Sequence, residues 1–273
     1  MVFTMPNEKK AVPAHAYSRE YFGTVCDGFN EFEKHAGGKM PERLEKAFAL
    51  VKVERGDAVL DVGCGRGELV VRAALAGAKA RGIDYSDEAL KFARSAIKKH
   101  GLQDKAKVMR ADAKKLPFDD GEFTKIFFTD VIEHMHDWEL REFMREARRV
   151  LRTGGEIVIE TSPNALLAKP LYFIGGLVGI NRGPVNQVVH VNEQTWFSIR
   201  RLLKEHGFKG KVWMEFDAGW FGAAVGGKRG AGLLMPIIKI MGNRGVKFIV
   251  EKSGAGIFVA PRIWCKAVKT EGD

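Results

Sequence analysis

The feature that most constrains the fold is a glycine-rich turn between a β-like run and a helical pattern. Residues 58–62 form a short apolar run, and Gly63, Gly65 and Gly67 follow at alternate positions before a helical pattern begins at Glu68. Glycines there remove the side chains that would keep a ligand from the backbone, and the following helix offers free N–H groups. The turn therefore predicts a strand–loop–helix unit that binds a ligand at a strand end.

A carboxylate at the end of the next β-like run supports this interpretation. Asp84 ends that run, nineteen residues after Gly65. In nucleotide-binding folds of this kind, such a carboxylate accepts hydrogen bonds from ribose hydroxyls. The glycine spacing is G-x-G-x-G rather than the dinucleotide G-x-G-x-x-G, and Asp61 would repel a pyrophosphate. We therefore favour an adenosyl ligand with a cationic end over a nicotinamide dinucleotide and an oxidoreductase.

Short β-like runs alternate with helical patterns along the chain, which is typical of a parallel sheet covered by helices. The predicted strands are Ala58–Val62, Lys79–Asp84, Ala106–Arg110, Thr124–Thr129, Glu156–Thr161, Phe208–Phe216 and Gly256–Lys269. Three helices are predicted. The first is capped by Ser86 and ends at Gly101. The second covers Trp138–Leu151 and is followed by a turn at 153–155, and the third covers Glu193–His206 and is capped by Asn192.

Several ordered motifs give the chain a family resemblance over residues 43–216. They are VLDVGCGRGEL, GIDYS, ADAKKLPFDDGEF, TDVIEHMHD and EARRVLRTGGEIVIETSPN. The sequence resembles class I S-adenosylmethionine-dependent methyltransferases, most closely the small-molecule subgroup that includes quinone-biosynthesis and lipid-modifying enzymes. The resemblance implies a Rossmann-like, doubly wound α/β fold with a seven-stranded sheet, mostly parallel with one antiparallel strand. It also implies a methyltransferase domain over 43–273, after an N-terminal helical lid segment over 1–42.

The resemblance also implies roles for individual residues in binding S-adenosylmethionine. The loop around the amino-acid part of the cofactor would contain Asp61, Gly63, Cys64, Gly65 and Gly67. Asp84 would bind the ribose hydroxyls, and Tyr85 would lie beside the adenine. Asp112 and Ala113 would contact the adenine. Thr129 and Asp130 would border the methionine moiety and the transferred methyl group. Two alternatives stay open, because Asp112 could cap a turn and Thr129 could be a buried strand residue.

The expected chemistry is an in-line displacement, which mainly requires alignment of the two reactants and exclusion of water. A hydroxyl acceptor would need a general base, for which His134 is the first candidate and His190 the second. The alternative is that Glu133 and His134 only orient their loop. His134 and His136 could suggest a metal, but no third ligand accompanies them, so no metal is expected.

Aromatic residues at helical spacing precede the first strand. They are Tyr17, Tyr21, Phe22, Phe29 and Phe32, with Val25 in the same pattern. The pattern favours a helix packed on the core, and the alternative is a lid whose tyrosines face a ligand.

Two apolar insertions, over 162–191 and 219–256, are expected at the active-site rim. Most of the net charge of +10 lies in them, because they contain Lys169, Arg182 and six further basic residues against Glu251 alone. Apolar and basic residues on one rim suit an anionic membrane surface. We therefore expect O- or N-methylation of a small-molecule or lipid-like acceptor, with an ordinary apolar lid or a dimer contact as alternatives for the insertions.

The remaining alternatives are a non-catalytic S-adenosylmethionine-binding protein and an RNA methyltransferase. Nucleic acid is disfavoured as a partner because the chain lacks an Asp/Asn-Pro-Pro-aromatic motif after the fourth strand and a Pro-Cys nucleophile. Three scattered cysteines, Cys26, Cys64 and Cys265, indicate a reducing compartment. The expected location is cytoplasmic, either free or peripheral at the inner membrane face, and the sequence leaves the oligomeric state open.

Overall fold

The computed structural model describes residues 11–24, 26, 28–177, 189–217, 243 and 254–271. Most of the predicted insertion over 219–256 lies outside the described residues, as do 178–188 of the other insertion. Among the basic residues of the two insertions, only Lys169 is described. The expectation that basic side chains gather at the active-site rim therefore lies outside the described residues.

The core is a seven-stranded sheet in the order β3-β2-β1-β4-β5-β7-β6. Its strands are β1 (Ala58–Val62), β2 (Lys79–Asp84), β3 (Ala106–Arg110), β4 (Phe123–Thr129), β5 (Leu151–Thr161), β6 (Phe208–Glu215) and β7 (Arg262–Lys269). β7 runs antiparallel to both neighbours, β5 and β6, while the other pairings of the described strands are parallel. The predicted doubly wound α/β fold with one antiparallel strand is confirmed.

Helices cover both faces of this sheet, and alternating strand residues supply each face with apolar side chains. The helices α3 (Glu42–Ala49), α4 (Glu68–Leu75) and α5 (Asp87–Lys99) share one apolar cluster with Phe127 of β4. The helices α6 (Asp137–Val150) and α9 (Trp196–Glu205) share the other with Ile126 and Phe128. The sheet is thus buried on both sides and holds the strand ends in fixed positions.

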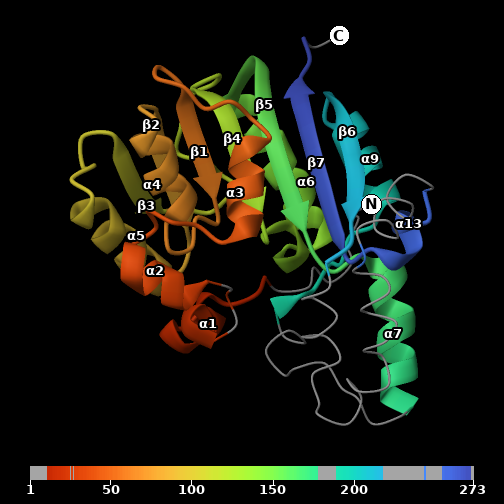
Figure 1. Ribbon diagram of the computed structural model, residues 1–273. Helices are drawn as coiled ribbons and strands as arrows, with labels where there is room; N and C mark the ends of the chain where they lie inside the picture. The colour runs from red at the N-terminus through yellow and green to blue at the C-terminus, as the bar shows by residue number, and fades with distance from the viewer. Residues whose placement is uncertain are drawn as a thin grey trace, which may run out of the picture.

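The carboxyl ends of the parallel strands lie at one edge of the sheet, at the bottom in Figure 1. The helices α1 (Arg19–Thr24), α2 (Phe29–His35) and α7 (Ala165–Leu177) lie at that same edge. Segments before the first strand and after the fifth therefore border the region where this architecture binds ligands.

The N-terminal segment differs from the continuous helix that its aromatic spacing predicts. It forms a short 3₁₀ turn, η1 (Ala14–Ala16), and then the separate helices α1 and α2. Gly28 has a φ of 75° at the N-cap of α2, a conformation that cannot continue a right-handed helix. The lid role and the boundary at residue 42 stay predictions.

Three further boundaries are corrected. The last helix before β6 begins at Trp196 and is capped by Thr195 rather than Asn192, since Thr195 Oγ1 accepts a hydrogen bond from Ser198 N at 3.0 Å. Residues 256–259 form the short helix α13 (Gly256–Val259), so the last strand begins at Arg262. The turn predicted at 153–155 lies within β5, where the register with β4 shifts.

Candidate functional site

The glycine turn joins β1 to α4, and its two later glycines have different surroundings. Gly65 and Gly67 have φ values of 50° and 84°, which side-chain-bearing residues rarely adopt. A Cβ at Gly67 would lie 2.8 Å from Cβ of Ala93, so this glycine lets α4 and α5 approach closely. A Cβ at Gly65 would meet only the Phe22 ring, at 3.8 Å. The backbone at Gly65 therefore borders open space in which a ligand fits.

Asp84 links the glycine turn to the start of α5. Its carboxylate accepts hydrogen bonds from Gly65 N at 3.0 Å and from Ser86 N at 2.8 Å. Burial raises the pKa of Asp84, although these backbone donors act in the opposite direction. The carboxylate is held at the cavity wall, where its remaining lone pairs could accept ribose hydroxyls.

Acidic groups are concentrated behind the glycine turn. Asp61 is buried, and burial together with the nearby Glu68 and Asp84 raises its pKa well above the usual value. Arg66 pairs with Glu68 at 2.8 Å and donates to the carbonyl of Phe22 at 3.2 Å. A cationic ligand would lower the repulsion among these carboxylates, which fits the cationic end expected of the cofactor.

One cavity of about 800 Å³ extends from the glycine turn to the loop after β4. The predicted site residues that line it are Gly63, Cys64, Gly65, Asp84, Tyr85, Asp112, Ala113, Thr129, Asp130, His134 and His190. Asp61 and Gly67 do not line it and act from behind the loop, as a buried carboxyl and a helix-packing glycine. The structure thus brings nine of the eleven predicted cofactor residues and both predicted catalytic histidines to one cavity.

The N-terminal segment covers this cavity with aromatic side chains. Tyr17, Tyr21 and Phe22 line it. Ser86 Oγ donates to the carbonyl of Tyr17 at 2.9 Å, which ties the segment to α5. The ring of Tyr17 also contacts His134 edge to face, with ring centroids 5.6 Å apart. The tyrosines face the cavity, as the lid alternative expected.

Asp112, at the predicted adenine end, has a structural partner as well. Its Oδ1 accepts a hydrogen bond from Lys114 N at 2.9 Å and forms an ion pair with Lys114 Nζ at 3.0 Å. It therefore does bridge a turn, the alternative left open by the sequence, and it also lines the cavity.

A buried ion-pair network lies beside the end of the cavity where the sequence predicts methyl transfer. Arg43 of α3 pairs with Asp130 at 2.8 Å and with Glu160 at 2.9 Å. Arg262 of β7 pairs with Glu160 and with Asp217, each at 2.5 Å. Burial raises the pKa of Asp130, but the two guanidinium groups outweigh that effect and hold it below its usual value. Asp130 also has a φ of 52°, which is strained for a residue with a side chain.

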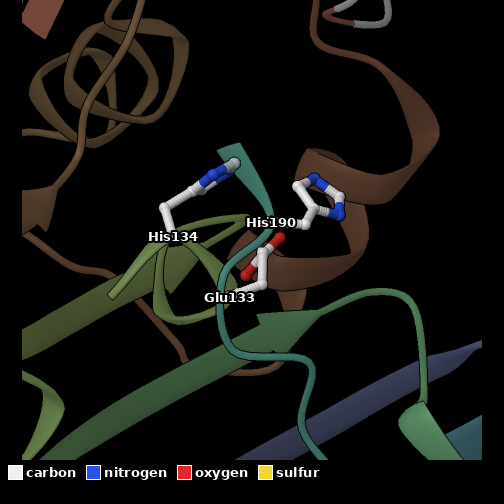
Figure 2. A group of neighbouring side chains, drawn as sticks. All are labelled: Glu133, His134 and His190. Atoms are coloured by element: carbon white, nitrogen blue, oxygen red, sulfur yellow. The ribbon is translucent and has the colours of Figure 1, made fainter. Parts of the chain in front are cut away.

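The loop after β4 brings Glu133 and His134 against His190. The three residues offer ligand-type atoms that all lie within 4.8 Å of one another. Figure 2 shows these neighbouring side chains. His134 Nδ1 lies 3.0 Å from the carbonyl oxygen of Val189, and Thr161 Oγ1 donates to Glu133 Oε2 at 2.8 Å. Burial lowers the pKa of His134 and raises that of Glu133 well above its usual value.

Residues 59–155 match a family model described as a methyltransferase domain. These residues carry a methyltransferase domain. The methyltransferase GfsG of Streptomyces halstedii is 38% identical over 125 residues, which are 45% of this chain and 43% of that protein. Sterol 4-C-methyltransferase strm-1 of Caenorhabditis elegans is 29% identical over 160 residues, 54% of this chain and 46% of that protein.

A solved structure shares the fold of this methyltransferase domain. Geranyl diphosphate C-methyltransferase from Streptomyces coelicolor A3(2) superimposes with a TM-score of 0.58 at 16% identity, over 95% of this chain and 88% of that one. The chain spans less than half the length of the two relatives above. The predicted cofactor, S-adenosylmethionine, agrees with the methyltransferase domain matched over residues 59–155, and the open backbone at Gly65 beside the Asp84 carboxylate fits it.

Several residues of the methyltransferase site were missed by sequence reasoning. Arg43 and Arg262 lie far from the motifs in sequence and reach the cavity only through the packing of α3 and β7. Glu160 has no exposed surface and joins the two arginines. The one available signal was its position: a carboxylate directly after the apolar run 157–159, next to the end of β5.

Proposed function

We propose that this domain transfers the methyl group of S-adenosylmethionine to a hydroxyl group of a small or lipid-like acceptor. The observation that carries the proposal is the single cavity that contains both the cofactor residues and the Glu133, His134 and His190 group. Its volume lies in the upper part of the range typical of small-molecule sites. Its aromatic cover from the N-terminal segment would exclude water, which in-line displacement requires.

The protonation of His134 supports an oxygen acceptor. A carbonyl oxygen only accepts hydrogen bonds, so the contact with Val189 places the proton of neutral His134 on Nδ1. Burial lowers the pKa of His134, so the neutral form is favoured and Nε2 carries a lone pair. The Glu133, His134 and His190 group could then assist removal of a proton from a hydroxyl group, which a nitrogen acceptor with its own lone pair would not require.

We propose further that the domain acts at a membrane surface, and exposed aromatic residues support this part of the proposal. Phe173 of α7 and Phe258 of α13 expose 72% and 61% of their surface, and these two helices are in contact. No helix in the described part of the chain combines the length and apolar character that crossing a bilayer requires. Aromatic side chains at the rim could instead enter the headgroup region. Co-sedimentation with anionic vesicles at low salt tests this, and a Phe173→Ser/Phe258→Ser double variant should bind less; absence of wild-type binding would remove the membrane part.

Calorimetric titration with S-adenosylmethionine and its demethylated product tests the cofactor assignment. We expect both to bind, and we expect Asp84→Asn to weaken binding about 10- to 100-fold, because hydrogen bonds to a charged group contribute about 1.5–3 kcal/mol. Heat with NADH and none with S-adenosylmethionine would overturn the assignment. A radiolabelled methyl-transfer screen against prenylated phenols, amines, lipid extract and RNA then identifies the acceptor class.

A further inference from the structure

We propose that Glu133, His134 and His190 form a binding site for a divalent transition cation. Each residue offers one ligand atom, and the atoms lie within 4.8 Å of one another. Figure 2 shows that the side chains come from two separate segments of the chain. This set differs from the His134 and His136 pair that the sequence suggested, because His136 stands at the N-cap of α6 and is not part of the cluster.

The two segments are fixed to each other by backbone hydrogen bonds. Val191 N and Asn192 N both donate to the carbonyl oxygen of Glu133, each at 3.0 Å. The return contact, from His134 Nδ1 to Val189 O, lies on the other side of His190. The backbone on both sides of His190 is therefore hydrogen-bonded to the loop that carries Glu133 and His134. These backbone contacts hold the three side chains next to one another.

Two of the three ligand groups are also oriented by second partners. The Val189 carbonyl holds the proton of His134 on Nδ1 and leaves the lone pair on Nε2. Thr161 Oγ1 fixes the Glu133 carboxylate through Oε2. Histidine ligands in metal sites typically donate their second N–H to a carbonyl or carboxylate, and carboxylate ligands are themselves hydrogen-bonded. The cluster has both features.

The charge around the cluster favours a dication. Arg43 and Arg262 form ion pairs with three carboxylates, those of Asp130, Glu160 and Asp217. The carboxylates of this network therefore outnumber its guanidinium groups even before Glu133 is counted. Glu133 exposes 1% of its surface, and no lysine or arginine among the described residues pairs with it. An ionised carboxylate buried in this way is costly unless a cation compensates it.

The donor set indicates the kind of cation. Two imidazole nitrogens and one carboxylate oxygen suit zinc and its neighbours and leave a fourth position open. Ligand atoms about 2.0–2.1 Å from a tetrahedral ion lie roughly 3.4 Å apart, so the side chains must close in by about an ångström. Rotations of the side chains about their own bonds supply a movement of this size.

The role of the cation rests on the proposed function, although its binding does not. The acceptor hydroxyl would occupy the open position, and its proton would leave to water because the cation lowers its pKa. An oxygen lone pair then forms the bond to the methyl carbon while the carbon–sulfur pair stays on sulfur. The products are the methyl ether, S-adenosylhomocysteine and the released proton. His134 would serve as a ligand in this scheme rather than as the base.

Titration of chelator-treated full-length protein with Co²⁺, followed by visible absorption, tests the site. We expect one equivalent to produce the d–d bands of a four- or five-coordinate ion, and Zn²⁺ to abolish them. His134→Gln, His190→Gln and Glu133→Gln should each weaken Co²⁺ binding more than about tenfold. His136→Gln is the matched control and should bind Co²⁺ as the wild type does.

Absence of the wild-type bands, or equal weakening by His136→Gln, would overturn the proposal. Circular dichroism and S-adenosylmethionine calorimetry on the same samples identify variants that have lost their fold. If all three variants have lost it, the wild-type titration with Co²⁺ alone decides whether the cation site exists. The calorimetry also separates the two proposals. Co²⁺ binding without cofactor binding would overturn the proposed function alone, and cofactor binding without Co²⁺ binding would overturn the cation site alone.

Discussion

Gly65 and Gly67 are two residues apart in one turn, yet we expect their alanine variants to fail in different ways. Gly67→Ala forces a Cβ to within 2.8 Å of Ala93 at a φ of 84°, which should lower the free energy of unfolding by about 3 kcal/mol. Gly65→Ala has room for its Cβ and should lose only about 1 kcal/mol. Its methyl group would occupy ligand space, so S-adenosylmethionine should bind at least about tenfold more weakly.

Urea unfolding and cofactor calorimetry measure the two effects separately. Equal loss of stability in both variants would contradict the assignment of Gly67 to helix packing and of Gly65 to the ligand.

At the scale of single residues, the sequence predicted the roles of residues within one local unit, but it did not predict contacts between residues that are far apart in the chain. The glycines and Asp84 act within one strand–loop–helix unit, so their spacing carried the information. His190 meets Glu133 only because the backbone of 191–192 hydrogen-bonds to the loop after β4. No spacing rule links those positions, which is why the sequence provided no third ligand beside His134.

Among the helices, two N-caps offer a matched test of how the N-terminal segment is held. Ser86 caps α5 and Thr195 caps α9, so either alanine variant should cost about 1 kcal/mol of stability. Only Ser86 also binds the carbonyl of Tyr17 in the segment that covers the cavity. Ser86→Ala should therefore weaken cofactor binding as well, whereas Thr195→Ala should leave it unchanged. Similar calorimetric affinities for the two variants would show that this anchor is unimportant.

Acid should release the contact between α6 and the loop before β4. The side chain of Arg149, with some help from Leu116 N, holds the pKa of Glu146 below its ordinary value of 4.5, although partial burial opposes this. The ionised carboxylate therefore stabilises the fold above about pH 4.5, and this contribution is lost as the pH falls through the lower, folded-state pKa. Near neutrality we expect Glu146→Gln to cost about 1 kcal/mol.

Thermal unfolding from pH 7 to pH 3 should show this difference from the wild type shrinking. Glu142→Gln is the control, because Glu142 pairs with the exposed Arg145 and its loss should change stability by less than about 0.5 kcal/mol. A Glu146→Gln difference that is constant with pH would refute the mechanism.

For whole elements, periodicity located the strands well and the helix ends less well. The predicted helix cap at Asn192 was wrong because residues 191–192 are used to bind the loop after β4, which delays the helix until Thr195. The single helix predicted before β1 was wrong because aromatic spacing persists across Gly28, where the backbone turns left-handed. In both places a tertiary contact or a glycine conformation outweighed the pattern.

At the scale of the whole molecule, the ion-pair network joins α3, the loop after β4, β5 and β7 around Glu160. Arg43→Met should lower the free energy of unfolding by about 3 kcal/mol, because it removes the guanidinium group that pairs with Asp130 and leaves the fully buried Glu160 with Arg262 as its remaining partner in the network. Lys91→Met breaks an exposed pair on α5 and should change stability by less than about 0.5 kcal/mol. Chemical denaturation compares the two, and similar losses would mean that the network is only a surface feature.

The sheet order has a consequence for synthesis of the chain on the ribosome. β7 is the last of the seven described strands to be made, yet it lies between β5 and β6, which do not pair with each other in the described sheet. Until its residues leave the exit tunnel, β6 and α9 have no place on the growing sheet, and the edge of β5 stays open to other chains. Arg262 arrives with that same strand. Translation thus delivers the strand that completes the described sheet and the Arg262 side chain beside the cavity at one moment, so a chain that stops before β7 has neither.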